Sequence, residues 1–258
     1  MFTRFILYFI PILLIISTGD HSLWAQKSLP EKKPHVLAWS LGGIFISQQT
    51  GYFNRQINLS NYNPEPTYGK AAGIGGKIHL NNKYFIQWQA LNSFQGQKYS
   101  FNQEETDTAG NITSLYLYTR SFELNYYKVP IMPGVIINPG KRIQLHAAIG
   151  PQIGYLNTAY YVLDADTIIR KDRSFKQTLK KLDVGIVLTS GFFAKITRHI
   201  YFNSALRFDI SLLDTESIRF KPVAYASSKN FTGGISFGLL WVFHPENISG
   251  ALPISAPR

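Results

Sequence analysis

Apolar and polar residues alternate along residues 142–156, which read Arg-Ile-Gln-Leu-His-Ala-Ala-Ile-Gly-Pro-Gln-Ile-Gly-Tyr-Leu. The odd positions are apolar, and the even positions are mostly polar or very small. Successive side chains of a β-strand point to opposite faces, so this pattern predicts a strand with one apolar and one polar face. The pattern recurs along the chain, and the apolar row carries large aromatic residues. Such repetition is typical of a transmembrane β-barrel, whose apolar face meets lipid and whose closed sheet leaves no backbone group unpaired.

The alternation predicts eight strands in all. They cover residues 35–47, 67–80, 84 to about 101, a segment within 115–137, 142–156, 182–196, 200–213 and 231–243. The seventh is very regular, with Phe202 and Leu206 on the apolar row and Arg207 and Asp209 on the polar row. An even number of evenly spaced strands favours closure. The sequence therefore predicts an all-β fold, an eight-stranded antiparallel up-and-down transmembrane barrel.

The fourth predicted strand is the least regular, because its two prolines remove ladder donors. The first outward residues expected there are Phe122, Leu124 and Tyr126. This set is out of phase with Val129 and Ile131, which are also expected to face outward. A bulge near Tyr127 would restore the phase.

The connections between predicted strands alternate in length. Those after strands two, four and six are short, at residues 81–83, 138–140 and 197–199, whereas the other four span about 10 to 25 residues. Outer-membrane barrels have short periplasmic turns and long outer loops, so both termini are expected in the periplasm. The alternative is a soluble, lipocalin-like barrel with an apolar interior. Aromatic residues at strand ends and glycines on the polar row favour the membrane barrel.

The two ends of the chain differ from the barrel segments. Arg4 precedes an apolar run over residues 5–16, which indicates an export signal with cleavage near Ala25. A dozen apolar residues fall short of the roughly 20 that a spanning helix needs. The expected organisation is a signal peptide at 1–25, a short periplasmic segment at 26–34, the barrel at 35–244 and a flexible tail at 245–258.

Composition narrows the class of protein further. The chain has no cysteine, which excludes disulfides, thiolate metal sites, a cysteine nucleophile and an acylated lipoprotein. Aromatic residues make up 14% and charged residues only 16%, whereas charged residues are about a quarter of a typical soluble domain. The net charge of +11 is scattered along the chain and forms no nucleic-acid-binding motif. Anionic lipid headgroups or surface polysaccharide are the favoured counterparts.

Three segments carry a resemblance to a known family. Residues 84–96 end in an aromatic, polar residues and glycine, residues 127–131 read Tyr-Lys-Val-Pro-Ile, and residues 148–156 contain Gly-Pro-Gln-Ile-Gly-Tyr. The chain resembles the PorT-like small outer-membrane beta-barrel family over nearly all of its mature length. It departs from the family pattern at Lys128, where Glu is frequent, and at Pro133, which interrupts a run of Leu.

The chain also departs from the common barrel ending, because residues 244–258 follow Phe243, the aromatic at the end of the last strand. The PorT-like family includes a component associated with a protein-secretion system, and many members have no assigned role. The resemblance therefore implies a fold and a location more than an activity.

Eleven polar side chains are expected on the inward row. They are Lys77, His79, Gln87, Gln89, Glu123, Gln144, His146, Gln152, Asp183, Arg207 and Asp209. Side chains alone fill the interior of an eight-stranded barrel, and buried charges must be paired. We therefore expect a lumen filled with hydrogen bonds and ion pairs, in which Arg207 and Lys77 neutralise Asp183, Asp209 and Glu123.

Catalytic and ligand sites have weaker support. His79 and His146 are the candidate bases of a lipid-modifying or proteolytic enzyme, with Asp183 or Asp209 to orient them, but they lie near short turns and not at the outer rim. The six histidines show no metal-ligand spacing. The acidic runs 104–107 and 164–166 fit weak calcium sites or, more simply, solvated loops. The glycine-rich run 73–76 is inside a strand and indicates tight packing, not a phosphate cradle.

The sequence thus predicts a protein of the outer membrane with no catalytic, cofactor-binding or metal-binding residues. The expected role is structural, interactive or accessory to protein secretion, through the long outer loops. Its expected partners are outer-membrane lipids and other cell-envelope or secretion-system proteins, with no nucleic acid, and the barrel is expected to be monomeric. The alternatives are a channel for small solutes and, with less support, a lipid-modifying enzyme.

Overall fold

The computed structural model describes residues 38–53, 63–65, 67–106, 112–165, 168–172, 174–216 and 228–243. The chain divides into two units, residues 1–34 and 35–258, and every described residue belongs to the second unit. The expected signal peptide, the segment at 26–34 and the tail at 245–258 lie outside the described residues.

The described part of the chain consists almost entirely of strands. They are β1 (Ala38–Phe53), β2 (Asn63–Glu65), β3 (Thr67–His79), β4 (Tyr84–Thr106), β5 (Ile112–Ile136), β6 (Ile143–Ala165), β7 (Ile168–Asp172), β8 (Leu182–Lys195), β9 (Ile200–Ser211) and β10 (Lys229–Phe243), with one short 3₁₀ helix, η3 (Ser174–Thr178). No helix among the described residues is long and apolar enough to cross a membrane.

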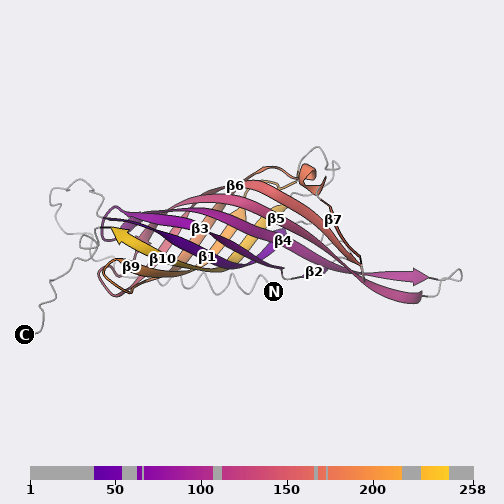
Figure 1. Cartoon of the computed structure of the whole chain (residues 1–258), viewed down its shortest axis with the longest axis horizontal. Helices are drawn as coiled ribbons and strands as arrows, with labels where there is room; N and C mark the ends of the chain where they lie inside the picture. The colour runs from indigo at the N-terminus through magenta and orange to yellow at the C-terminus, as the bar shows by residue number, and fades with distance from the viewer. Residues whose placement is uncertain are drawn as a thin grey trace, which may run out of the picture. The chain divides into compact units, whose positions relative to one another are not determined.

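Eight of these strands close into a barrel. Each of β1, β3, β4, β5, β6, β8, β9 and β10 pairs antiparallel with the next in this order, and β10 pairs with β1 (Figure 1). The two remaining strands extend the sheet, because β2 pairs with β4 and β7 pairs with β6. The predicted eight-stranded antiparallel up-and-down barrel is confirmed.

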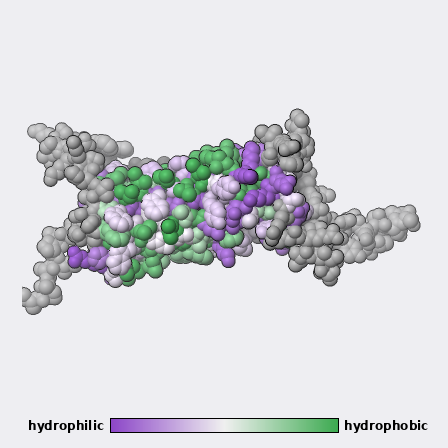
Figure 2. Space-filling view, turned by 45° about the horizontal axis from the view of Figure 1, so that its top comes forward, coloured by the Kyte–Doolittle hydropathy of each residue, from purple (hydrophilic) through white to green (hydrophobic). Residues whose placement is uncertain are grey.

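The two faces of the barrel differ in the direction that a membrane requires. Large apolar side chains point outward, with Leu239 57% and Ile149 54% exposed, whereas Arg207 and Lys128 are each 2% exposed in the lumen. Figure 2 shows hydrophobic residues over the middle of the barrel and hydrophilic ones mainly toward the end from which β4 and β5 emerge. A soluble barrel with an apolar interior would have the opposite arrangement, so lipid is the solvent of the outer face.

Three short turns join strand pairs at one end of the barrel, here called the short-turn end. A side chain holds each turn: the Asn81 Oδ1 atom accepts hydrogen bonds from the backbone N–H groups of Lys83 (2.8 Å) and Tyr84 (2.7 Å). In the second turn the Asn138 Oδ1 atom accepts a hydrogen bond of 2.6 Å from the Leu145 N–H group. In the third turn the Thr197 Oγ1 atom accepts one of 3.1 Å from the Ile200 N–H group. The opposite end is called the loop end.

Aromatic rings gather on the outer face at the short-turn end. Trp39 of β1 stacks on Phe243 of β10 with ring centroids 3.7 Å apart, and His199 stacks on Trp241 at 5.5 Å. Rings with a polar edge suit the boundary between lipid and water, where outer-membrane barrels carry aromatic girdles. These pairs therefore mark one membrane boundary.

The expectation for the fourth predicted strand is wrong in its phase. Leu124 and Tyr126 of β5 are buried in the lumen, whereas Tyr127, Val129 and Ile131 are exposed on the outer face. The even residues Leu124, Tyr126, Lys128 and Met132 therefore face inward, and no bulge near Tyr127 is needed in β5. The pairing of β5 with β6 shifts by one residue here, and the extra residue belongs to β6. Asn125 pairs with Thr158 and Tyr126 pairs with Leu156, so the pairing skips Asn157.

The predicted third and fourth strands are also too short. β4 and β5 pair as far as Thr106 and Ile112, so residues 107–111 alone separate them, in place of the long loop that was expected. Residues 112–118 read Ile-Thr-Ser-Leu-Tyr-Leu-Tyr, and β-branched and aromatic residues suit a strand whether or not lipid surrounds it. The two strands therefore continue past the rest of the barrel as a ribbon.

Candidate functional site

A group of polar side chains occupies the middle of the lumen, and we call it the arginine cluster (Gln89, Lys128, Gln152, Arg207 and Asp209). Arg207 of β9 donates to both oxygens of Asp209, at 2.7 Å from Nε to Oδ1 and 3.2 Å from Nη2 to Oδ2. Its Nη2 atom also donates to Gln152 Oε1 at 2.9 Å, and its Nη1 atom donates to Gln89 Oε1. The guanidinium is thus fixed by four hydrogen bonds to groups from β4, β6 and β9.

Lys128 of β5 brings a second cation to the arginine cluster. Its ammonium lies 3.5 Å from Asp209 Oδ2, so one carboxylate meets two cations. The second lumen carboxylate, on Asp183 of β8, accepts a hydrogen bond from the hydroxyl of Ser211. The buried residues Leu124, Tyr126 and Leu156 pack together as an apolar cluster, and Lys128 Nζ lies 5.8 Å from the Tyr126 ring centroid. Apolar packing next to the ion pairs lowers the local dielectric constant and strengthens them.

A second group lies nearer the short-turn end, and we call it the lysine cluster (Lys77, Phe85, His146, Phe193 and Asn203). Asn203 Oδ1 lies 2.9 Å from His146 Nε2 and accepts a hydrogen bond of 3.5 Å from Lys77 Nζ. The Lys77 ammonium is 3.3 Å from the centroid of the Phe193 ring and 5.0 Å from that of Phe85, and His146 stacks on Phe193 at 4.0 Å. Aromatic rings and one amide, and no carboxylate, thus surround this ammonium.

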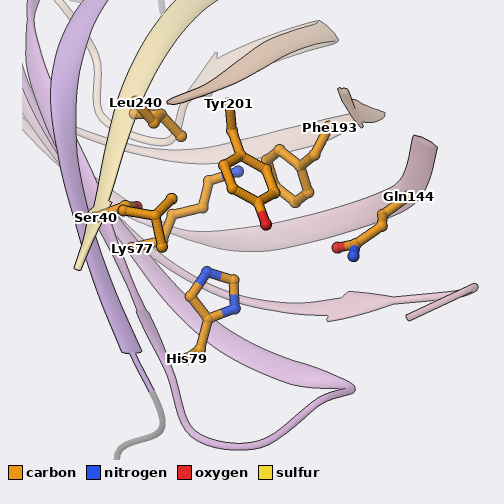
Figure 3. Close-up of a pocket in the computed structure, with 8 residues that line it drawn as sticks. Ser40, Lys77, His79, Gln144, Phe193, Tyr201 and Leu240 are labelled. Carbon is orange, nitrogen blue, oxygen red and sulfur yellow. The ribbon is translucent and has the colours of Figure 1, made fainter. Parts of the chain in front are cut away.

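A small cavity lies beside the lysine cluster. Its wall consists of Ser40, Lys77, His79, Gln144, Phe193, Tyr201, Leu240 and Val242. In Figure 3 the Tyr201 hydroxyl, the His79 ring and the Gln144 amide point toward the same space. About 10 Å³ is open to the centre of a water molecule, which is close to the least that one water needs. The cavity is therefore the size of one water molecule or one small ion.

Most of the residues predicted to face inward do so. Lys77, His79, Gln87, Gln89, Gln144, His146, Gln152, Asp183, Arg207 and Asp209 are all buried in the lumen. Glu123 is the exception, since it lies exposed on the outer face of β5. The predicted pairing is confirmed for Arg207 with Asp209 and is wrong for Lys77, which has no carboxylate partner among the described residues.

Lys128 is the functional residue that the sequence argument missed. Setting Leu124 and Tyr126 outward required a bulge near Tyr127, and Lys128, next to that bulge, was left out of the expected inward row. The signal was present in the exposed set Val129, Ile131 and Val135, which fixes the outward phase on odd numbers.

The candidate catalytic residues are not brought together. His146 Nε2 contacts the Asn203 amide, His79 lies beside Phe85, and Asp183 contacts Ser211. A base oriented by a carboxylate needs a hydrogen bond between the two, and none joins these groups in the described part of the chain. No three metal-ligating side chains come together there either. The acidic runs at 104–107 and 164–166 have no described side chains to compare.

The glycine-rich run in β3 packs tightly, as predicted. A Cβ atom on Gly73 would lie 1.9 Å from the backbone oxygen of Ala90, and one on Gly75 would lie 2.4 Å from the Ile44 side chain. Both distances are far inside van der Waals contact. Glycine is thus required where β3 approaches β1 and β4.

A closed sheet with a lipid-facing apolar exterior and a filled polar lumen defines a small transmembrane β-barrel. A model of the family described as "Outer membrane protein beta-barrel domain" matches residues 24–217. The chain belongs to this family, and it is a protein of the outer membrane.

Solved structures with the same kind of barrel are similar to most of the chain. Neisserial surface protein A is 7% identical with a TM-score of 0.42, covering 80% of this chain and 97% of its own. OprG from Pseudomonas aeruginosa is 11% identical with a TM-score of 0.45, covering 83% and 100%. Ail of Yersinia pestis is 10% identical with a TM-score of 0.33, covering 78% and 98%. No curated protein sequence matches the chain.

Proposed function

We propose that this protein is a non-enzymatic structural or interaction protein of the outer membrane. It contacts other cell-envelope or secretion-system proteins through the strands that extend beyond the loop end of the barrel. It acts as a monomer surrounded by outer-membrane lipid, and its residues 1–25 are a signal peptide that directs export.

The observation that carries this proposal is the length of β4 and β5. Pairing of β4 with β3 ends at Phe94, yet β4 continues to Thr106. Twelve further residues of strand correspond to about 40 Å. β2 lies beside β4, β6 lies beside β5, and β7 lies beside β6. The part of the sheet toward the loop end therefore has five strands on one side of the barrel (Figure 1).

The far part of this ribbon has free edges. Among the described residues, β4 has no partner but β5 beyond Ser100, and β5 has no partner but β4 before Thr119. Unpaired backbone N–H and C=O groups on an edge strand can pair with a strand of another protein. A partner that adds a strand at either edge would bury these groups, and this geometry supports an interaction role.

The packing of the lumen argues against the channel alternative. Arg207, Tyr126, Phe85 and Lys128 are among the largest fully buried side chains of the molecule. The cavity near the short-turn end admits about one water molecule. An eight-stranded barrel filled in this way has no continuous aqueous path for solutes.

In-cell crosslinking tests the interaction role. A photoreactive amino acid at Tyr116, in the ribbon, should give discrete adducts of higher mass in intact cells, because the ribbon meets its partner outside the barrel. The same substitution at Lys141, in a short turn, is the matched control and should not give those adducts. A variant in which a two-residue turn replaces residues 101–118 should lose them too.

Two outcomes would contradict the proposal. Adducts of the same masses from Tyr116 and from Lys141, in full-length protein that shows heat-modifiable gel mobility, would mean that the ribbon is not the contact surface. Stable, large unitary currents from the purified protein in planar bilayers would support a channel instead.

A further inference from the structure

Lys77 is a buried amine with no carboxylate partner among the described residues. Its side chain is 3% exposed, and its contacts are the Phe193 and Phe85 rings and the Asn203 amide oxygen. Both lumen carboxylates are engaged elsewhere, Asp209 with Arg207 and Lys128 and Asp183 with Ser211. An ammonium taken out of water without a counter-charge is costly, so this site favours a negatively charged occupant.

The cavity beside Lys77 is rich in hydrogen-bond donors. The wall has the ammonium of Lys77, the hydroxyls of Ser40 and Tyr201 and the amide of Gln144, and it has no carboxylate. Ser40 Oγ and His79 Nδ1 are both buried and have no hydrogen-bond partner within the described structure. Phe193, Leu240 and Val242 form the apolar remainder of the wall. Buried polar atoms without partners, facing a space beside a cation, indicate a missing ligand.

The size of the cavity restricts what that ligand can be. Room for about one water-sized sphere favours a monatomic anion over a larger oxyanion such as phosphate or sulfate. The wall residues also sit near strand ends: His79 is the last residue of β3, and Gln144 and Tyr201 are the second residues of β6 and β9. A small ion would therefore reach the cavity from the short-turn end.

We propose that this cavity binds a single chloride-sized halide ion, with Lys77 as its counter-charge and Ser40, His79, Gln144 and Tyr201 as the surrounding polar groups. The ion would complete the charge balance of the lumen near the short-turn end, as Asp209 does in the arginine cluster. It would also satisfy the unpartnered Ser40 and His79 atoms.

Urea unfolding of the detergent-solubilised full-length protein tests this site. Chloride is titrated against gluconate at constant ionic strength, since gluconate is too large for the cavity. Binding to the folded state alone should raise the folding equilibrium constant about tenfold once chloride reaches about nine times its Kd. Lys77→Met should abolish this response. Lys83→Met makes the same change in an exposed lysine of a short turn and should keep it.

Crystals grown in bromide provide a direct measurement that does not depend on the folding of any variant. An anomalous peak in the cavity, within hydrogen-bonding distance of Lys77, is the expected result. Unfolding curves of the wild-type protein that coincide in chloride and gluconate, together with no bromide peak in the cavity, would overturn the proposal and leave a single water molecule there.

Discussion

The arginine cluster and the lysine cluster occupy the same lumen but handle buried charge differently. On β9, Asn203 belongs to one and Arg207 to the other, four residues or about 13 Å apart. Arg207 and Lys128 share Asp209, whereas Lys77 meets only rings and an amide. The cations of the arginine cluster thus share a carboxylate of the chain, whereas Lys77 has no carboxylate partner among the described residues. The difference suggests that the arginine cluster fills and stabilises the lumen, whereas the lysine cluster is a site that needs a bound anion.

Removing the guanidinium of the arginine cluster should have the largest effect on stability. Arg207→Ala takes away four hydrogen bonds and leaves Asp209 with Lys128 alone. Breaking a buried pair typically costs about 3–5 kcal/mol, and we expect a loss in this range in urea unfolding with detergent or vesicles.

Phe208→Leu is the matched control on the next residue of the same strand. Phe208 belongs to the outward row of β9 and is only half-buried. Lipid accepts either side chain, and a conservative apolar exchange of this kind usually costs less than about 1.5 kcal/mol. Equal losses for Arg207→Ala and Phe208→Leu would mean that the inward assignment of Arg207, and with it the contrast between the clusters, is wrong.

Giving the lysine cluster its own carboxylate should have the next largest effect. Asn203→Asp places an anion where the amide oxygen now accepts from Lys77 and contacts His146. A hydrogen bond to a charged group contributes about 1.5–3 kcal/mol, and the burial of the new carboxylate opposes it. We therefore expect the free energy of unfolding, measured in urea without chloride, to rise by about 1.5 kcal/mol.

Asn203→Asp also tests whether the missing counter-charge at Lys77 distinguishes the two clusters. With Lys77 neutralised from within the chain, stability should no longer depend on chloride. Asn203→Leu removes the amide without adding a charge and should keep the chloride response. A chloride response in Asn203→Asp as large as that of the wild-type protein would show that the missing charge at Lys77 is not what distinguishes the two clusters.

The barrel was predictable from the sequence because its signal is periodic and repeated. One row of each strand meets lipid, so the apolar residues Phe202, Leu206 and Ile210 show which face of β9 points outward. Arg207 and Asp209, on the other face, therefore point into the lumen. The partners of these charges were less predictable, because pairing across the lumen depends on register. Lys128 was missed because the residues before it, Leu124 and Tyr126, were set one residue out of phase, and such a slip moves side chains to the other face.

Both ends of the barrel show where the periodic signal fails. Inside the short-turn end, Leu240 and Val242 of β10 are apolar although they face inward, so both rows of that strand are apolar there. At the loop end, β4 and β5 leave the membrane and lose the lipid that imposes the alternation. The length of the ribbon therefore had no comparable signal in the pattern of apolar residues.

Breaking an exposed ion pair should have the smallest effect on the free energy of unfolding, and it provides a comparison for the buried pair. Lys98 Nζ lies 3.2 Å from Glu65 Oε2 outside the barrel, with side chains 45% and 36% exposed. Water screens such a pair, so Lys98→Ala should cost about 0.2–1 kcal/mol. A hydrogen bond from Ser100 lowers the pKa of Glu65 most; burial opposes it, and a hydrogen bond from Lys98 and the charge of Lys98 lower the pKa further.

The sign of the pH dependence at Glu65 follows from that lowered pKa. The folded state holds the carboxylate form, so the stabilisation is present above the unfolded pKa of Glu65 and is lost as the pH falls through the folded one. In Lys98→Ala the pKa should rise toward its ordinary value while Ser100 keeps part of the shift. NMR titration of the Glu65 carboxyl group measures this change. A loss of stability in Lys98→Ala equal to that in Arg207→Ala would mean that burial in the lumen does not strengthen the ion pairs of the arginine cluster.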